Sequence, residues 1–186
     1  MASRTGTAGP PDQPPASGLR LRPPRLDDEA AFRRAHEMMA RESFTFGLGF
    51  EPDAAWGPYL TMLDDHRRGV NLAPGLVPAT FLVADVSGTI VGRSSIRHEL
   101  NDFLEREGGH IGYCVLPGHR RRGYATEILR QSLVIARAVG VQQALLVCDD
   151  GNTGSRAVIE GCGGRLASRG TSSSPEGQPI RRYLIG

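Results

Sequence analysis

Hydrophobic positions in the first third of the chain change from the spacing of a strand to that of helices. Residues 19–26 predict a short strand that is closed by two prolines. Asp27 or Asp28 is expected to cap a helix that runs to about Glu42, because apolar positions recur three to four residues apart. A second helix is predicted to begin at Pro52, after a loop rich in Gly and Phe. One face of this second helix is apolar: Trp56, Tyr59, Leu60 and Leu63.

Further along the chain, short apolar runs predict strands that alternate with turns and helices. The predicted strands cover residues 80–86, 89–98, 110–116 and 143–149. Helices are expected over residues 122–138 and 152–162, and a hairpin ending in the strand 180–185 closes the chain. The order β-α-α-β-β-β-α-β-α-β-β predicts one α/β domain, over residues 19–186, around a mixed sheet.

The N-terminal segment differs in composition from the rest of the chain. Residues 1–18 are rich in Pro, Gly and Ser, so we expect a disordered tail. This segment lacks the apolar core of a secretion signal, and no run approaches the ~20 apolar residues of a membrane span. We therefore expect a cytoplasmic protein without a membrane partner.

Composition excludes several kinds of chemistry. All 22 basic residues are Arg, which rules out a catalytic lysine, a pyridoxal-phosphate Schiff base and a P-loop lysine. The net charge of +2 is too small to indicate a nucleic-acid partner. Three cysteines without C-x-x-C spacing favour free thiols over a metal site, and no metal is expected: Cys114, Cys148 and Cys162.

The segment HRRRGYAT places three consecutive arginines before a glycine, where a strand ends and a helix begins. The first amides of a helix lack intrahelical acceptors, and the helix dipole adds partial positive charge there. Gly123 and Ala125 are small, so an anion can approach these amides closely, and the arginines add charge. The turn therefore predicts a site for a phosphate or pyrophosphate.

The pattern R-x-x-G-x-A, formed by Arg120, Gly123 and Ala125, resembles the pyrophosphate loop Q/R-x-x-G-x-G/A of the GNAT superfamily of N-acetyltransferases. The flanking strands GHIGYCV and LLVCD resemble the family's fourth and fifth strands, and NTGSRAVIEGCGG resembles its next helix. The resemblance covers roughly residues 19–185. It implies a GNAT-like fold with a mixed sheet of about six to seven strands, splayed between strands four and five. About four helices would flank this sheet, and acetyl-CoA would be the co-substrate.

The resemblance also implies roles for individual residues. Backbone groups of Cys114 and Val115 would pair with the pantetheine arm as an added strand would. Asn152 would bond the same arm, assisted by Ser155. The pyrophosphate would lie against the residues of the turn: Arg120, Arg121, Arg122, Gly123, Tyr124, Ala125 and Thr126.

Acetyl transfer to an amine requires a base that removes the amine proton. In several family members this base is a carboxylate on the fourth strand, and the matching residue here is His110. With an unperturbed pKa of about 6.5, a histidine is mostly neutral near pH 7.5. Glu107 and Glu99 are the alternative bases. Many relatives protonate the leaving thiolate with a Tyr, whose position here is Ile159, so that donor is missing. The alternatives for this step are Tyr113, Tyr124 and water.

The acceptor site of this superfamily is built from the first two helices, their loop, and the third and fourth strands. In this chain, residues 98–107 carry four carboxylates against one Arg. They favour a cationic acceptor by Coulomb attraction, although a solvated acidic loop is the alternative. The predicted acceptor-binding residues are Phe46, Trp56, Glu99, Asp102 and Glu107.

We therefore expect a small-molecule amine as acceptor, such as an aminoglycoside-type aminosugar, with a role in antibiotic resistance or self-protection. A protein N-terminus or lysine is the second candidate acceptor. A catalytically idle acyl-CoA sensor is a third interpretation, because the usual Tyr is missing. The closing strand 180–185 is expected to allow pairing between two chains in a homodimer.

Overall fold

The computed structural model describes residues 18–186, in which seven strands form two sheets. The disordered tail predicted over residues 1–18 lies, apart from Gly18, outside the described residues. The larger sheet has the order β1-β2-β3-β4, and its neighbouring strands are all antiparallel. Its strands are β1 (Leu19–Arg22), β2 (Ala79–Val86), β3 (Thr89–Arg97) and β4 (Ile111–Val115).

The smaller sheet has the order β5-β7-β6 and is also antiparallel. It contains β5 (Ala144–Asp149), β6 (Arg165–Thr171) and β7 (Pro179–Ile185). Since β7 is hydrogen-bonded to β5 on one side and to β6 on the other, it has no free edge. The homodimer expected through residues 180–185 is therefore not possible by simple strand pairing, because the chain itself occupies both edges.

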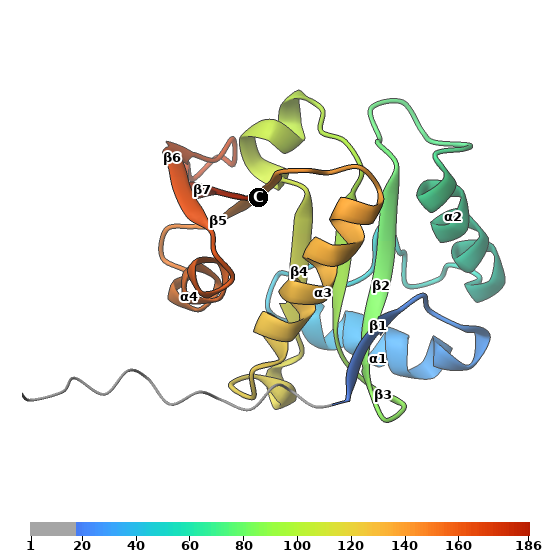
Figure 1. Cartoon of the computed structure of the whole chain (residues 1–186). Helices are drawn as coiled ribbons and strands as arrows, with labels where there is room; N and C mark the ends of the chain where they lie inside the picture. The colour runs from blue at the N-terminus through green and yellow to red at the C-terminus, as the bar shows by residue number, and fades with distance from the viewer. Residues whose placement is uncertain (1–17) are drawn as a thin grey trace, which may run out of the picture.

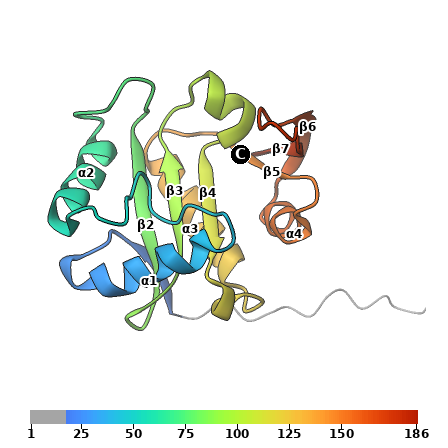
Figure 2. The same cartoon turned by 180° about the vertical axis from the view of Figure 1, so that it is seen from behind.

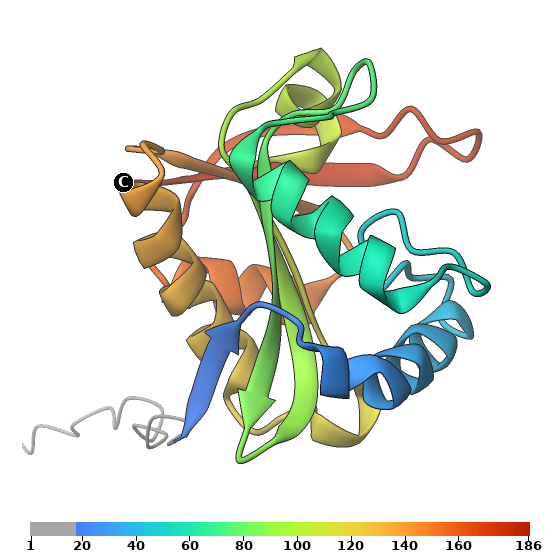
Figure 3. The same ribbon diagram turned by 90° about the vertical axis from the view of Figure 1, so that its right-hand side faces the viewer.

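Helices cover both faces of the larger sheet, as Figures 1 and 2 show from opposite sides. The pair α1 (Glu29–Ala40) and α2 (Trp56–Arg68) lies on one face, and α3 (Tyr124–Ala138) lies on the other (Figure 3). The helix α4 (Thr153–Gly161) lies beside the smaller sheet (Figure 1). Short helical turns occur at Leu26–Asp28, Leu104–Gly108 and Pro117–His119. The order of helices and strands agrees with the order predicted from the sequence.

The second helix begins four residues later than predicted, at Trp56 instead of Pro52. Residues 51–54 form a separate turn, closed by a 3.0 Å hydrogen bond from the Ala54 amide to the Glu51 carbonyl. The Trp56 indole then donates to the Arg25 carbonyl over 3.1 Å, which fixes the start of the helix against the preceding segment.

An aromatic core fills the space between the sheet and the two N-terminal helices. Phe32 is fully buried at its centre, and its ring lies 5.0 to 6.0 Å from five other aromatic rings. Those rings belong to Phe46, Phe50, Trp56, Tyr59 and Phe81. Edge-to-face and tilted arrangements of this kind stabilise a core beyond the burial of area alone.

Candidate active site

β4 and β5 touch at one end and then diverge. The His110 amide donates to the Leu145 carbonyl over 2.7 Å, and the Leu145 amide donates to His110 Nδ1 over 2.9 Å. The preceding Gly109 has φ +62°, and a Cβ there would lie 2.6 Å from the Leu145 carbonyl oxygen. Within residues 18–186 no strand ladder joins β4 to β5. We call this diverging edge, from His110 and Leu145 onward, the splay.

Hydrogen bonds at both ends of β4 fix which backbone groups face the splay. The His110 carbonyl and the Leu116 amide both bond to β3, over 2.8 and 2.9 Å. Because backbone groups alternate sides along an antiparallel strand, Cys114 also faces β3, in register with Arg93. Of the two residues predicted to pair with pantetheine, Val115 is therefore the one whose backbone faces the splay.

The turn before α3 has the geometry of an anion site. Gly123 is the N-cap with φ +77°, and no side chain of residues 18–186 caps the helix. Arg121 also has a positive φ, of +63°. The amides of residues 121–126 donate to no backbone carbonyl within the described part of the chain. Free amides and the positive end of the helix dipole thus converge at this turn.

The arginines of the turn differ in their surroundings. Arg120 donates from Nε to the Val115 carbonyl over 3.1 Å, and its guanidinium forms an ion pair with Glu42. Its side chain therefore ties the turn to β4 and to the end of α1. Arg121 and Arg122 are exposed and form no ion pair within residues 18–186. Their charges are available to an anion in solution.

Residues of α4 reach toward β4 on the same side as α3. Asn152 is the N-cap of α4, and its Oδ1 accepts from the Ser155 amide over 2.9 Å. The Ser155 hydroxyl lies 3.2 Å from the Tyr113 hydroxyl of β4. Burial raises the pKa of Tyr113 to about 12, so this hydroxyl stays protonated at neutral pH. The spacing N-x-x-S predicts the cap of α4, but the pair of Tyr113 and Ser155 hydroxyls forms only in the fold.

The environment of His110 favours its neutral form. Burial lowers its pKa, and the positive charge of Arg97 lowers it further. Nδ1 accepts a hydrogen bond from Leu145, so the neutral ring carries its proton on Nε2. To take up a second proton, the ring must therefore release the Leu145 amide. Protonation of His110 by the amine would therefore break its hydrogen bond with Leu145, a contact that the sequence does not reveal.

The residues predicted to bind the acceptor do not converge. Phe46 and Trp56 are 0% and 5% exposed and belong to the aromatic core, so neither side chain is available to a ligand. In the sequence, the helical spacing of Trp56 with other apolar residues already indicates that its side chain packs in a core. Glu99 and Asp102 are exposed, and Glu107 accepts from the Ser173 amide over 2.9 Å.

Two arginines on β3 were not predicted from the sequence as site residues. Arg93 and Arg97 project from the same face of the strand, which is covered by α1 and α2, and both are half-buried. The sequence does indicate these residues, because Arg93 and Arg97 are charged and stand four positions apart in an apolar strand. This spacing puts both side chains on one face.

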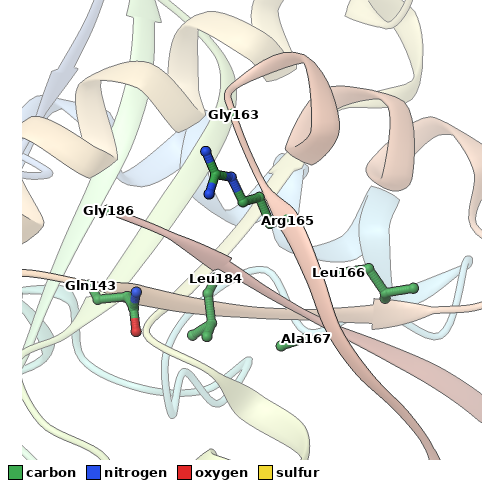
Figure 4. A pocket seen from close by; sticks show the side chains of 7 residues that line it. All are labelled: Gln143, Gly163, Arg165, Leu166, Ala167, Leu184 and Gly186. Atoms are coloured by element: carbon green, nitrogen blue, oxygen red, sulfur yellow. The ribbon is translucent and has the colours of Figure 1, made fainter.

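Two hollows of similar size lie on the surface of the described chain. One, of about 410 Å³, is formed by the smaller sheet and its ends and is lined by Arg165, Leu184 and their neighbours (Figure 4). None of its lining residues belongs to the turn or to the splay. The other, also of about 410 Å³, lies between the end of α1 and the loop that follows it. Its lining residues include Phe44 and Thr45, which contact Arg93.

Residues 18–186 contain neither a cluster of metal ligands nor a membrane-spanning helix. No group of three or more His, Cys, Asp or Glu side chains is arranged to hold a metal ion in this part of the chain. Over the same residues, every helix is too short or too polar to cross a membrane.

Solved structures with this fold are numerous. Mycobacterium smegmatis RimJ in complex with CoA-disulfide is 22% identical with a TM-score of 0.68, over 92% of this chain and 83% of that one. RimL, a ribosomal L7/L12 alpha-N-protein acetyltransferase, is 16% identical with a TM-score of 0.66, over 93% and 92%. A spermidine N-acetyltransferase SpeG chimera from Vibrio cholerae and hSSAT is 15% identical with a TM-score of 0.62, over 91% and 95%. No curated protein sequence matches the chain.

The family model described as "Acetyltransferase (GNAT) domain" matches residues 18–165, which include the turn, the splay and the start of β6. The GNAT resemblance and the GNAT-like α/β fold predicted from the sequence are thereby confirmed. This chain belongs to the GNAT acetyltransferase family.

Proposed function

We propose that this protein transfers an acetyl group from acetyl-CoA to a primary amine by direct attack. The observation that carries the proposal is the turn at residues 121–126, whose unpaired amides lie at the end of β4 beside the splay. A pyrophosphate bound there would direct the pantetheine arm along β4. The CoA-disulfide bound to the related RimJ structure supports this choice of co-substrate.

In the proposed reaction the amine nitrogen attacks the thioester carbonyl carbon, and the carbon–sulfur bond breaks. The amine loses a proton and the departing CoA thiolate gains one. The Val115 backbone holds the pantetheine arm, assisted by Asn152 and Ser155. His110 remains the candidate base, because its lowered pKa keeps it neutral at physiological pH.

The departing thiolate needs a proton donor other than the family's usual Tyr. Ile159, at the position of the family's usual Tyr, is fully buried and apolar. We assign the donor role to the Tyr113 hydroxyl, which Ser155 orients, with water as the alternative. A CoA thiol leaves tolerably as a thiolate, since ordinary thiols have a pKa of about 8.5.

The proposed acceptor is a primary amine and, more specifically, a small cationic amine. A primary amine follows from the family chemistry, and a small cationic amine, such as an aminoglycoside-type aminosugar, follows from the acidic stretch at residues 98–107. A protein N-terminus is the second candidate. The related structures include enzymes named for spermidine and for a ribosomal protein, so this fold serves both acceptor classes.

Incubation with acetyl-CoA and an amine panel, with detection of free thiol, tests the proposal. Turnover of aminosugars or polyamines supports the first acceptor class, and turnover of peptides supports the second. Tight binding of acetyl-CoA without turnover of any amine would leave the acyl-CoA sensor as the function. Absence of both binding and turnover would overturn the proposal.

A further inference from the structure

Two arginine side chains lie side by side on the β3–β4 face that α1 and α2 cover. A Cβ on Gly112, the β4 residue between them, would lie 3.2 Å from Arg97 Nη1 and 3.5 Å from Arg93 Nη1. Both guanidiniums thus contact the same glycine, and a larger residue there would displace them. Neither arginine forms an ion pair with a carboxylate within residues 18–186.

The polar partners of these guanidiniums are backbone carbonyls, which do not neutralise charge. Arg93 donates to the Gly112 carbonyl over 2.8 Å and to the Thr45 carbonyl over 3.1 Å. Arg97 reaches the Gly108 and Gly109 carbonyls only over 3.4 and 3.5 Å. Two neighbouring positive charges therefore remain uncompensated, an arrangement that is costly away from bulk water.

Unsatisfied polar atoms gather at the same place. The Arg93 Nε and the Ser95 hydroxyl are both buried without a hydrogen-bond partner within the described residues. Ser95 lies between the two arginines on the same face of β3, opposite Gly112. Buried donors normally find a partner, so an orphaned row of donors indicates that a bound group supplies the acceptor.

The electrostatics of the neighbouring groups agree with this reading. Burial and the charge of Arg93 lower the pKa of Arg97 to about 10, which still leaves Arg97 charged at neutral pH. The charge of Arg97 also acts on His110, so the arginine row extends to the residue at the start of the splay. At its other end, Arg93 contacts Phe44 and Thr45, which line the hollow of about 410 Å³.

We propose that Arg93, Ser95 and Arg97 bind a carboxylate group of the substrate, beside the atoms that react at the splay. A carboxylate accepts two parallel hydrogen bonds from a guanidinium and would neutralise part of the paired charge. This proposal rests on the proposed acyl transfer from a CoA thioester, and it replaces either the aminosugar or the plain acetyl group with a substrate that carries a carboxylate. The carboxylate belongs either to the amine acceptor, as in an amino acid, or to the acyl group, as in a dicarboxylic acyl-CoA.

Matched substrate pairs distinguish these two sources. With acetyl-CoA as donor, amino acids are compared with their own amides; with one fixed amine, succinyl-CoA is compared with acetyl-CoA. We expect kcat/KM to favour the carboxylate in one of the two comparisons by about 10- to 100-fold, as for a charged hydrogen bond. Arg97→Gln should abolish that preference, whereas Arg34→Gln, on the exposed face of α1, should leave it intact.

A second readout does not depend on turnover. If the carboxylate belongs to the acceptor, N-acetylglycinate should raise the Tm of the wild-type protein at constant ionic strength, and N-acetylglycinamide should not. If it belongs to the acyl group, succinate should raise the Tm and succinamide should not. Arg97→Gln should lose this shift, yet keep or raise the Tm of the free protein, because it removes a charge without a partner. If neither comparison shows a preference and the Tm shift is absent, the inference is overturned. Failure of acetyl-CoA binding with a retained Tm shift would instead reject the proposed function alone.

A structural role for Arg97 predicts a different result. Loss of folding or a lower Tm in Arg97→Gln would count against a substrate-binding role. Arg97→Lys keeps one charge but cannot form two parallel hydrogen bonds to a carboxylate. It should therefore retain the Tm of the free protein and only part of the substrate preference, and full preference in this variant would also contradict the proposal.

Discussion

The two hydrogen bonds between His110 and Leu145 give this single residue two possible tasks. As a base, its ring must take up a proton from the amine. As a connection between the sheets, its Nδ1 must stay unprotonated to accept from the Leu145 amide. The tasks compete for the same lone pair, so substitutions at this position separate them.

Asparagine is the informative substitution, because its Oδ1 can replace Nδ1 as an acceptor but does not act as a base. We expect His110→Asn to bind acetyl-CoA normally, and to lose about 10²-fold or more in kcat if His110 is the base. His110→Ala leaves the Leu145 amide unsatisfied and should cost roughly 1–3 kcal/mol in unfolding free energy. Wild-type turnover in His110→Asn, measured by thiol release, would remove the residue from the proton transfer.

At the scale of elements, the site depends on where β4 and β5 meet and on how α3 begins. Gly109 makes the close approach of the two strands possible. Its backbone, at φ +62° and ψ −176°, lies in a region that is accessible essentially to glycine alone. The Leu145 carbonyl occupies the space that a side chain would need.

Gly109→Ala should therefore destabilise the protein strongly. The backbone strain costs on the order of 1–3 kcal/mol, and the contact at 2.6 Å adds to it by forcing the strands apart. Gly57→Ala is the matched control, since a Cβ there meets nothing within 4 Å and the residue lies in a helix. Chemical denaturation should show a clear loss for the first variant and none for the second. Equal stability of both variants would show that the strand contact is not constrained as described.

The sequence predicted the elements better than it predicted the surroundings of their side chains. Local spacing specifies a strand or helix, and the helix-starting turn has a local signature around Gly123, so both were found. Partners far apart in the chain, such as Tyr113 and Ser155, become neighbours only in the fold. For the same reason, the sequence did not show that the Trp56 side chain lies in the core and not at the acceptor site. Nor did it show that β7 lies between two other strands.

In the whole molecule, the hydrogen bonds between His110 and Leu145 connect the two sheets. The protonation of His110 is therefore linked to the free energy of unfolding. Burial lowers the pKa of three histidines, His66, His98 and His110, in the folded protein. Their ordinary pKa of about 6.5 returns on unfolding, so the unfolded chain binds protons first as the pH falls. The stabilisation is complete above about pH 6.5 and is lost as the pH falls through the folded-state values.

The free energy of unfolding should therefore decrease between pH 7.5 and pH 5.5. Each histidine contributes a slope of at most about 1.4 kcal/mol per pH unit. Denaturation curves at several pH values measure the total, and His110→Asn should show a smaller slope than the wild-type protein. A stability that is constant or increases over this range would contradict the folded-state environment described for these side chains.

The proposed function requires that the amides at residues 121–126 bind the pyrophosphate of acetyl-CoA, and calorimetric titration of acetyl-CoA measures this binding. Gly123→Asp places a carboxylate at this turn and is compared with Gly75→Asp. The control adds the same charge at a glycine with a similar positive φ, in the loop after α2. We predict that Gly123→Asp loses affinity by about 10²-fold or more, while Gly75→Asp binds like the wild-type protein. Unchanged binding in Gly123→Asp would show that the pyrophosphate does not lie at this turn.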